Sequence, residues 1–356
     1  MSEDRKGAKG RQKGADDRRA SDDAGEGRPA NAKSRALVGV LGLVAPGLGH
    51  AFVGHARRGA AWAVSPAVAV VLLASVLPSS TSAGRVVAIC GAASALLYLA
   101  SIVDAVVLSP ARHRALSPAG VFATLAAPLV LSIGVALFLR SSVVQAFKVP
   151  SGSMIPTIML GDHLFVDMRA HAPRRGEAIV FRYPERPSQE FLKRVVAGPG
   201  DELVVRGGKL TINGWQVPSC RVGSWSYDDE SSKHTGDVFV EFLERSAYLV
   251  FFESGASPPD EVQGPYRVAD GEWFVVGDNR FNSHDSRMWF GGAGGGVPTA
   301  KVRGRATTIW SSTVPGRFGV DLAADPVPPA PELAAPLAAC LASRPPVDKA
   351  TPPARP

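Results

Sequence analysis

A serine, a lysine and a polar segment, in three separate stretches, carry the strongest chemical signal in this chain. Ser153 lies in VPSGSMIPT, Lys193 follows in FLKRVVAGPGD, and GDNRFNSHDSR begins at Gly277. Serine is a poor nucleophile at neutral pH and needs a base within hydrogen-bond reach. A lysine can be that base where burial lowers its pKa by roughly 2 units from about 10.4. Alone, Phe-Leu-Lys-Arg would indicate a surface lysine on an edge strand; together, the three segments predict a serine/lysine hydrolase.

These segments, with GDHLFVD at Gly161 and VRGRATTIW at Val302, resemble the bacterial type I signal peptidases. Members of that family are membrane-bound enzymes that remove signal peptides from exported proteins. The resemblance covers about residues 141 to 312. It implies that Ser153 is the nucleophile, that Lys193 is the general base, and that Ser151 and the backbone N–H of Ser153 form the oxyanion hole.

The same resemblance assigns supporting roles around the dyad. It implies that Ser283 hydrogen-bonds and positions the Lys193 amine, and that Asp285 and Arg287 form an ion pair. Further supporting residues are Asp278, Asn279 and Arg280, in a turn that holds the site together, and Arg194, beside the lysine. The chain departs from the family pattern at the glycine-rich stretch Gly291 to Gly296, which precedes Val297 and Pro298. This insert is either a lid over the site or a flexible loop without a role.

Other kinds of hydrolase fit less well. A Ser-His-Asp triad would use His284 and Asp285, but adjacent residues of a strand point to opposite faces and would orient one another poorly. The histidines are scattered and form no close cluster with cysteines, so we expect no metal and no cofactor. The related repressor-cleaving proteases share the serine/lysine chemistry, but they are soluble and lack the third segment.

Residues 36–140 are expected to form a membrane region. Apolar runs at Gly59–Pro78, Val86–Leu108 and Ala119–Leu139 approach the twenty residues that cross a bilayer, and the second contains one charged residue. The shorter run Ala36–Phe52 is interrupted at Pro46, and we expect a re-entrant or interfacial hairpin there. This gives three spans, with four complete spans as the alternative. Asp104 falls near the cytoplasmic end of a span, where it is either functional within the membrane or a structural residue that snorkels to the interface or caps a neighbour.

Basic residues indicate the orientation of this region. Residues 1–35 hold ten Lys and Arg against seven Asp and Glu, and are expected to be a disordered cytoplasmic tail. Arg57, Arg58, Arg112 and Arg114 mark loops on the same side, so the third span exits outside the cytoplasm and places Ser153 there. The net charge of +7 does not indicate nucleic-acid binding, because the basic tail adjoins a membrane and attraction to anionic lipid explains it.

Residues 141–322 are expected to form a mainly-β catalytic domain of the signal peptidase type. Short apolar or alternating runs, separated by Gly, Pro and Asp, predict its strands; they are FKVP, HLFVD, EAIVFRY, RVVA, ELVVR, KLTING, YLVFF and EWFVVGD. Asn213-Gly214 predicts a hairpin with a type I′ turn. The resemblance assigns about 220–266 to a smaller β subdomain. The Ala- and Pro-rich residues 323–356 are expected to be a flexible tail. Cys220 and Cys340 are expected to be free thiols, with pairing in an oxidising compartment as the alternative.

The function implied is that of a membrane-anchored serine endopeptidase in the inner (plasma) membrane, with its catalytic domain on the extracytoplasmic, periplasmic side. Its partners would be preprotein signal peptides, the lipid bilayer and the protein translocation machinery, with no nucleic acid. The resemblance implies cleavage after small residues. Two alternatives stay open: a specialised maturation peptidase of a secretion system, and an inactive homologue that binds preproteins.

Overall fold

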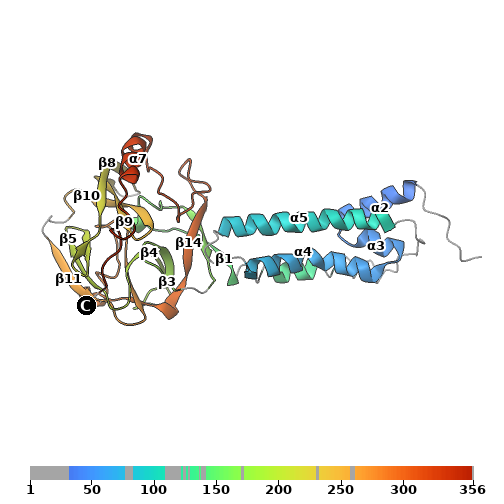
Figure 1. Ribbon diagram of the computed structural model, residues 1–356, viewed down its shortest axis with the longest axis horizontal. Helices are drawn as coiled ribbons and strands as arrows, with labels where there is room; N and C mark the ends of the chain where they lie inside the picture. Colours follow the sequence, from blue (N-terminus) through green and yellow to red (C-terminus); the bar gives the residue numbers. More distant parts are fainter. Residues whose placement is uncertain are drawn as a thin grey trace, which may run out of the picture. The chain divides into compact units, whose positions relative to one another are not determined.

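The computed structural model describes residues 32–76, 83–108, 142–169, 172–229, 232–256 and 261–354, with scattered positions between 122 and 137. The chain divides into two compact units. One consists of residues 1–76 and 88–137, and the other of residues 77–87 and 138–356. Every named strand belongs to the second unit (Figure 1). The basic tail before residue 32, the loop with Arg112 and Arg114, and most of the run Ala119–Leu139 lie outside the described residues.

The helical unit begins with a hairpin. Helices α2 (Ala32–Val44) and α3 (Leu48–Val53) are separated at Pro46, and α4 (Ala56–Val76) and α5 (Ala83–Leu108) follow (Figure 1). The break expected at Pro46 is therefore present. Gly47 makes it possible, because its φ is 87° and a Cβ there would lie 2.0 Å from the carbonyl oxygen of Gly59.

A polar cluster joins three of these helices around Asp104. The carboxylate accepts hydrogen bonds from Arg58 at 2.7 and 2.9 Å and from the Trp62 indole at 2.6 Å, and it lies 2.8 Å from the Nε2 atom of His50. An acidic side chain on an apolar helix is thus paired from two neighbouring helices. Of the two expected roles, the structure shows the structural one, as a partner for adjacent polar groups.

Within the described residues one helix is long and apolar enough to cross a membrane, at Ala88–Leu108. Its large side chains are exposed, with Leu96, Leu99, Val103 and Val107 each more than half accessible. The expected span Gly59–Pro78 corresponds to α4, which has Pro66 in its interior and does not meet the same criterion. Three spans are therefore not shown.

The second unit contains three antiparallel sheets. The largest has seven strands in the order β1 (Val144–Lys148), β2 (His163–Asp167), β14 (Val302–Ser311), β3 (Ala178–Arg182), β4 (Glu190–Ala197), β12 (Glu272–Val276) and β13 (Val297–Pro298). A four-stranded sheet has the order β11 (Val262–Arg267), β5 (Glu202–Arg206), β6 (Lys209–Ile212) and β7 (Trp215–Gln216), and a three-stranded sheet the order β10 (Ser246–Glu253), β9 (Lys233–Leu243) and β8 (Ser219–Asp228).

The local predictions for this unit hold well. All eight predicted strand segments overlap an observed strand, because each combines apolar alternation with turn residues at its ends. The predicted hairpin pairs Ile212 with Trp215, and both turn residues have positive φ, 51° at Asn213 and 78° at Gly214. These are the signs that a type I′ turn requires.

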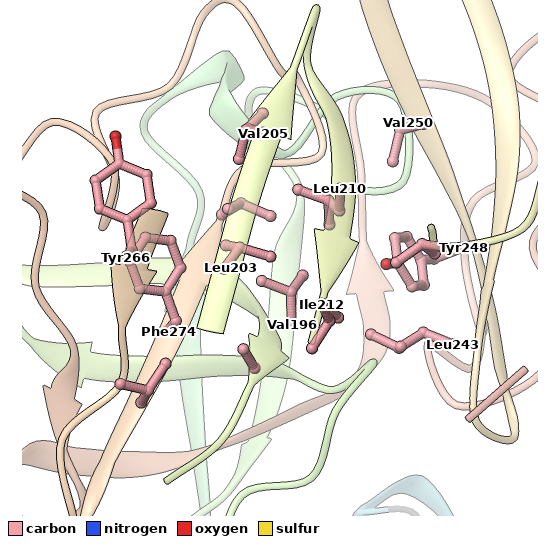
Figure 2. Close-up of a cluster of buried hydrophobic side chains, with 14 residues drawn as sticks. Val196, Leu203, Val205, Leu210, Ile212, Leu243, Tyr248, Val250, Tyr266 and Phe274 are labelled. Carbon is pink, nitrogen blue, oxygen red and sulfur yellow. The ribbon is translucent and has the colours of Figure 1, made fainter. Parts of the chain in front are cut away.

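A hydrophobic core joins the three sheets. Figure 2 shows Val196 of β4 and Phe274 of β12 beside Leu203 and Leu210 of the four-stranded sheet, with Tyr248 of β10 on the opposite side. All five side chains are at most 1% exposed. Apolar burial of this kind stabilises a fold by about 25 cal/mol per Å². Strand β4, which carries Lys193, therefore packs one face against side chains of the other two sheets.

The smaller β subdomain expected at 220–266 is shorter than predicted. The three-stranded sheet ends at Glu253, and β11 pairs with β5 in the other sheet. The error has a physical reason, since the polar segment before β11 looks continuous with the subdomain, whereas the pairing of β11 with a strand sixty residues earlier leaves no local signal.

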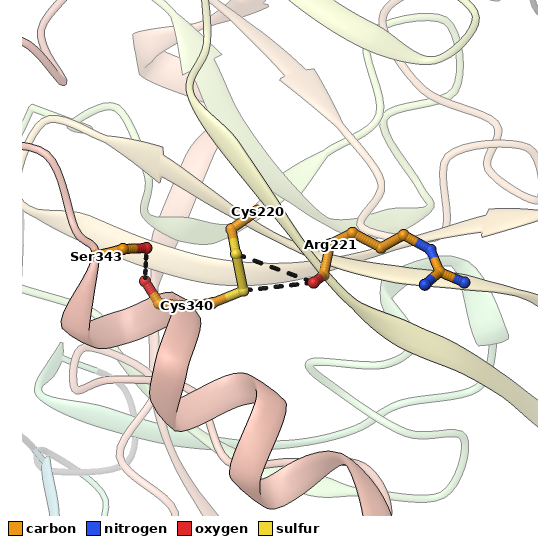
Figure 3. The surroundings of a disulfide bond; sticks show 4 residues. All are labelled: Cys220, Arg221, Cys340 and Ser343. Atoms are coloured by element: carbon orange, nitrogen blue, oxygen red, sulfur yellow. Dashed lines mark hydrogen bonds between the residues drawn. A yellow bond between two sulfur atoms is a disulfide. The ribbon is translucent and has the colours of Figure 1, made fainter.

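The expectation of a flexible tail and free thiols is wrong. Residues Ala334–Ala342 form helix α7, which packs against β8 and β9 through Leu333, Leu337 and Cys340 (Figures 1 and 3). Cys340 forms a disulfide with Cys220 across 120 residues of sequence. Alanine and leucine are good helix formers, and three apolar side chains on one face give the segment a reason to dock that its overall Pro and Ala content conceals.

We predict that Cys340→Ser lowers the free energy of unfolding by about 2–4 kcal/mol, because a disulfide that closes a long loop restricts the unfolded chain. Thermal unfolding of the full chain in detergent, followed by circular dichroism with and without reductant, measures the effect. Cys90→Ser, at the buried free cysteine, is the control for loss of a thiol. Alkylation of Cys220 and Cys340 in the folded, unreduced protein would contradict the pairing.

Candidate active site

The nucleophile candidate lies in a short turn between β1 and β2. Residues Gly152–Met154 form a 3₁₀ turn in which Ser153 is 8% exposed. The apolar neighbours Ile155 and Ile158 are at most 2% exposed, so they belong to the core and do not form a rim around the nucleophile. The buried side chains of Ile155 and Ile158 therefore anchor the turn to the core, and Ser153 lines the cavity.

Ser153 and Lys193 meet across the sheet. The Lys193 amine donates a hydrogen bond of 2.6 Å to the Ser153 hydroxyl, and the Ser151 hydroxyl lies 3.2 Å from that of Ser153. Lys193 is 5% exposed on β4, and its amine lies 5.5 Å from the centre of the Phe191 ring. The three residues predicted to share one site are thus brought together.

Burial sets the protonation of this lysine. It lowers the pKa of Lys193 to about 8, and the charges of Asp285 and Asp278 oppose the shift without cancelling it. An amine with this pKa is substantially neutral in mildly alkaline solution. The arrangement therefore holds a free amine beside a hydroxyl, which is the condition for general-base activation of serine.

The predicted ion pairs surround the dyad and are fully buried. Arg287 bonds Asp285 twice at 2.8 Å, which confirms that pair. The charge and hydrogen bonds of Arg287 lower the pKa of Asp285 against the opposing effect of burial, which is the largest single influence. Asp285 also accepts the backbone N–H of Gly277 at 2.9 Å. The carboxylate therefore fixes the start of the segment that packs behind Ser153.

Two further arginines tie this segment to the sheets. Arg194, next to Lys193, bonds Asp278 at 2.7 and 2.6 Å and stacks on the Tyr248 ring. Arg280 donates to the carboxylate of Glu241 and, at 2.8 Å, to the carbonyl of Gly208. Buried charges are tolerated only when they are paired in this way. Alternation on β4 thus places the amine toward the serine and the guanidinium of the next residue toward Asp278.

The expected hydrogen bond between Ser283 and Lys193 is not formed. The Ser283 hydroxyl is buried, and it interacts with Asp285, whose pKa it helps to lower, and not with the Lys193 amine. It packs instead on the backbone of Gly277, where an added Cβ would lie 2.3 Å from the Ser283 Oγ atom and 2.5 Å from the Ser153 carbonyl oxygen. Gly277 is therefore the spacer that lets Ser283 and the nucleophile turn approach each other.

A cavity of about 360 Å³ opens over the dyad. Its apolar wall includes Phe147, Leu164, Val180 and Leu192. Extended backbone runs along both flanks, at residues 147–151 and at 190–193. In the described sheet, β12 pairs with β4 only from Arg194 onward, so the edge of β4 beside Lys193 has no strand partner.

Known proteins share this combination of segments. The family described as signal peptidase, peptidase S26, matches residues 122–311, more than half of the chain. The chain belongs to this family. It is 30% identical over 267 residues to signal peptidase I of Pseudomonas aeruginosa, covering 64% of this chain and 89% of that protein. It is 33% identical over 200 residues to signal peptidase I of Leptolyngbya laminosa, covering 53% and 80%. The chain is therefore a serine peptidase, as its three segments predicted.

The histidine beside Asp285 has another role in this peptidase. The Nε2 atom of His284 lies 3.0 Å from the Tyr183 hydroxyl, and its ring packs edge-on against Tyr183 and Phe191. Asp285 faces the opposite way, toward Arg287. Among the described residues, the Ser153 hydroxyl bonds to Lys193 and Ser151 and no histidine contacts it, which agrees with the rejection of a triad.

The glycine-rich insert is ordered in this peptidase. The N–H groups of Gly294 and Gly295 bond the carbonyls of Trp289 and Ser286 at 3.1 and 3.0 Å. Gly294 has a φ of 79°, and a side chain there would meet the Tyr266 ring at 2.3 Å. The insert is therefore a hydrogen-bonded turn and not an unstructured loop. Its backbone bonds to that of Trp289, whose side chain is fully buried.

Two residues that fasten the site belong to no motif in the sequence. Glu241 pairs with Arg280 from β9, and Arg317 donates to Asp162 at 2.8 Å and to the Thr157 carbonyl at 2.7 Å. Arg317 lies just beyond the stretch that carries the family resemblance, and Glu241 sits in an unremarkable alternating strand. In the sequence each is recognisable only as a charged residue, and nothing there shows that the fold buries it.

We predict that Gly277→Ala reduces peptidase activity by more than about 100-fold, because the methyl group displaces either the Ser153 carbonyl or Ser283 by a sizeable fraction of an ångström, and small displacements in an active site have effects of this size. The rate of substrate cleavage at matched protein concentration measures it. Gly91→Ala, whose methyl meets nothing within 4 Å, is the control and should retain full activity. A Gly277→Ala enzyme within tenfold of wild type would contradict the close packing.

Proposed function

We propose that this chain is a membrane-anchored serine endopeptidase that removes signal peptides from exported preproteins, with Ser153 as nucleophile and Lys193 as general base. One observation carries the proposal: a buried lysine with a pKa of about 8 lies 2.6 Å from a serine hydroxyl at the floor of an open cleft. When the amine is neutral, the serine O–H donates to its lone pair in the same geometry.

The chemistry follows from these two groups. Lys193 accepts the proton of Ser153 as the oxygen attacks the peptide carbonyl, and the negative charge forms on the carbonyl oxygen. The Ser153 N–H and the Ser151 hydroxyl stabilise that charge as the oxyanion hole. The Lys193 ammonium then returns the proton to the departing amine, leaving an ester on Ser153. Water, deprotonated by Lys193, hydrolyses the ester and releases the signal peptide with a free carboxylate.

The cleft supports an extended substrate. The unpaired edge of β4 at residues 190–193 offers backbone donors and acceptors to a peptide strand, and residues 147–151 form the opposite wall. A strand bound in this way presents alternate side chains to the apolar lining, which suits small residues before the cut. Processing enzymes that cut at such sites need little more from a substrate than an extended segment beside the membrane.

Two features support anchoring with the catalytic domain outside the cytoplasm. Ala88–Leu108 is long and apolar enough to span a bilayer, and α4 and Ala119–Leu139 are the further spans of the proposal. The Cys220–Cys340 disulfide is a bond of oxidising compartments. On the periplasmic side the enzyme would meet preproteins as the translocation machinery delivers them.

Catalysis accounts better than binding alone for the burial of Lys193. A pKa lowered from 10.5 to about 8 costs folding on the order of 3 kcal/mol near pH 7, because the unfolded state binds the proton more strongly. An inactive homologue that only binds preproteins could replace this lysine with an apolar residue and gain stability. A free amine is needed only for proton transfer.

Ser153→Ala and Lys193→Ala are each expected to abolish cleavage of a synthetic preprotein by the detergent-solubilised chain, since they remove the nucleophile and the base. Lys193→Arg should be equally inactive, because a guanidinium cannot be deprotonated in a protein. Quantification of mature product on gels measures the effect. Activity within tenfold of wild type in any of the three would exclude this dyad.

The pH dependence should report Lys193 directly. Only the neutral amine can act as base, so kcat/KM should rise with pH through a midpoint of about 8, and level off above it. Initial rates between pH 6 and 10 on a short peptide substrate give the profile. A midpoint near 10.5, the ordinary lysine value, would show that burial does not tune this amine.

A further inference from the structure

Asn279, in the third segment, forms two hydrogen bonds to the turn that carries Ser153. The backbone N–H of Asn279 donates to the Ser153 carbonyl at 3.1 Å, and its side-chain amide donates to the Gly152 carbonyl at 3.2 Å. Asn279 is fully buried. Its two contacts hold the carbonyl groups that precede and follow the backbone N–H of Ser153.

These two bonds bear on the oxyanion hole because of peptide geometry. The Gly152 carbonyl and the Ser153 N–H belong to one planar trans peptide unit and point in opposite directions. A bond that fixes the carbonyl on the inner side therefore fixes the N–H on the cleft side. The turn bond from the Ile155 N–H to the same carbonyl, at 3.1 Å, acts in the same sense.

The Asn279 amide is itself held by the three-stranded sheet. Its second N–H donates to the Tyr227 hydroxyl at 2.8 Å. With both amide hydrogens engaged by acceptors, the reversed amide would place its oxygen against the Gly152 carbonyl oxygen, which is repulsive. The Gly152 carbonyl thus sets which way the amide faces, and the Tyr227 hydroxyl, by accepting the second N–H, holds the amide at the nucleophile turn.

Tyr227 is held in turn by a histidine that lies between two carboxylates. Its ring stacks on His234, with ring centres 4.7 Å apart and planes at 15°. His234 lies between Glu253, at 2.8 Å, and Asp229, at 2.9 Å, and the bond to Glu253 raises its pKa most, against partial opposition from burial. Stacking of the two rings is favourable, and more so in the protonated state that the carboxylates favour. His234, on the strand that pairs with that of Tyr227, therefore fixes the position of the Tyr227 ring.

We propose that Tyr227 is a positioning residue for the oxyanion hole, acting through the Asn279 amide on the Gly152–Ser153 peptide unit. The inference rests on the proposed function of Ser153. It assigns the three-stranded sheet a part in catalysis: the sheet orients the donor that binds the transition-state oxygen, without touching the substrate.

Tyr227→Phe tests this with minimal change of shape, because it removes only the hydroxyl. We expect kcat for preprotein cleavage by the full chain to fall about tenfold, a fraction of the loss on deleting an oxyanion donor outright, with KM within twofold of wild type. A peptide boronic acid, whose tetrahedral adduct with Ser153 carries the oxyanion, should bind less tightly by the same factor. The pH midpoint set by Lys193 should not move.

Ser226→Ala is the matched control. Ser226 precedes Tyr227 on β8 and bonds Thr235 on the other face of the sheet, so its loss removes a hydroxyl from the same hairpin without reaching Asn279. It should retain wild-type kcat and boronic-acid affinity. Equal losses in the two variants would reduce the role of Tyr227 to stability of the hairpin and overturn the inference.

A double-mutant cycle with Asn279→Ala tests the route. If Tyr227 acts through Asn279, Tyr227→Phe adds no further loss in the Asn279→Ala background, whereas additive losses would overturn the route. Wild-type speed in Tyr227→Phe would overturn the inference while leaving the proposed function intact. Absence of cleavage in the wild type would overturn the proposed function, and the inference with it.

Discussion

An amine buried against a serine hydroxyl is the constraint around which the catalytic unit is built. The amine of Lys193, 2.6 Å from the Ser153 hydroxyl, has a lowered pKa only while it is shielded from water, since solvation would restore the ordinary value. Shielding requires β4 to lie in the middle of the largest sheet, packed against the core in Figure 2. The position of the base in the chain is therefore inseparable from the fold that surrounds it.

The negative charges near this amine would undo its function if they were not compensated. Asp278 and Asp285 each favour the ammonium form, and each is neutralised by an arginine at hydrogen-bond distance, Arg194 and Arg287 respectively. The arginines bring carboxylates into the interior as structural links, and the carboxylates raise the pKa of Lys193 less than burial lowers it. The ion pairs thus serve both rigidity and the electrostatics around Lys193.

The sequence predicted those parts of the structure that depend on local pattern or on a motif. Strand segments, the Asn213-Gly214 hairpin and the meeting of Ser153 with Lys193 belong to this class. It failed where a long-range partner decides the outcome. α7 docks because β8 and β9 supply an apolar surface, and Glu241 is needed because Arg280 is buried beside it. Ser283 was assigned to the lysine by resemblance, whereas packing against Gly277 holds its hydroxyl elsewhere.

The contacts between residues 340–353 and the sheets affect the order in which the protein can fold. Cys340 pairs with Cys220, and the backbone near it completes the unit, with the N–H of Glu244 bonded to the Ala350 carbonyl and the Asn213 amide bonded to the Pro353 carbonyl. These partners leave the ribosome long after the strands that receive them. The sheets must therefore wait, partly uncovered, until residues 340–353 have been synthesised and Cys340 has been oxidised. The unit that holds Ser153 and Lys193 is completed only at that late stage.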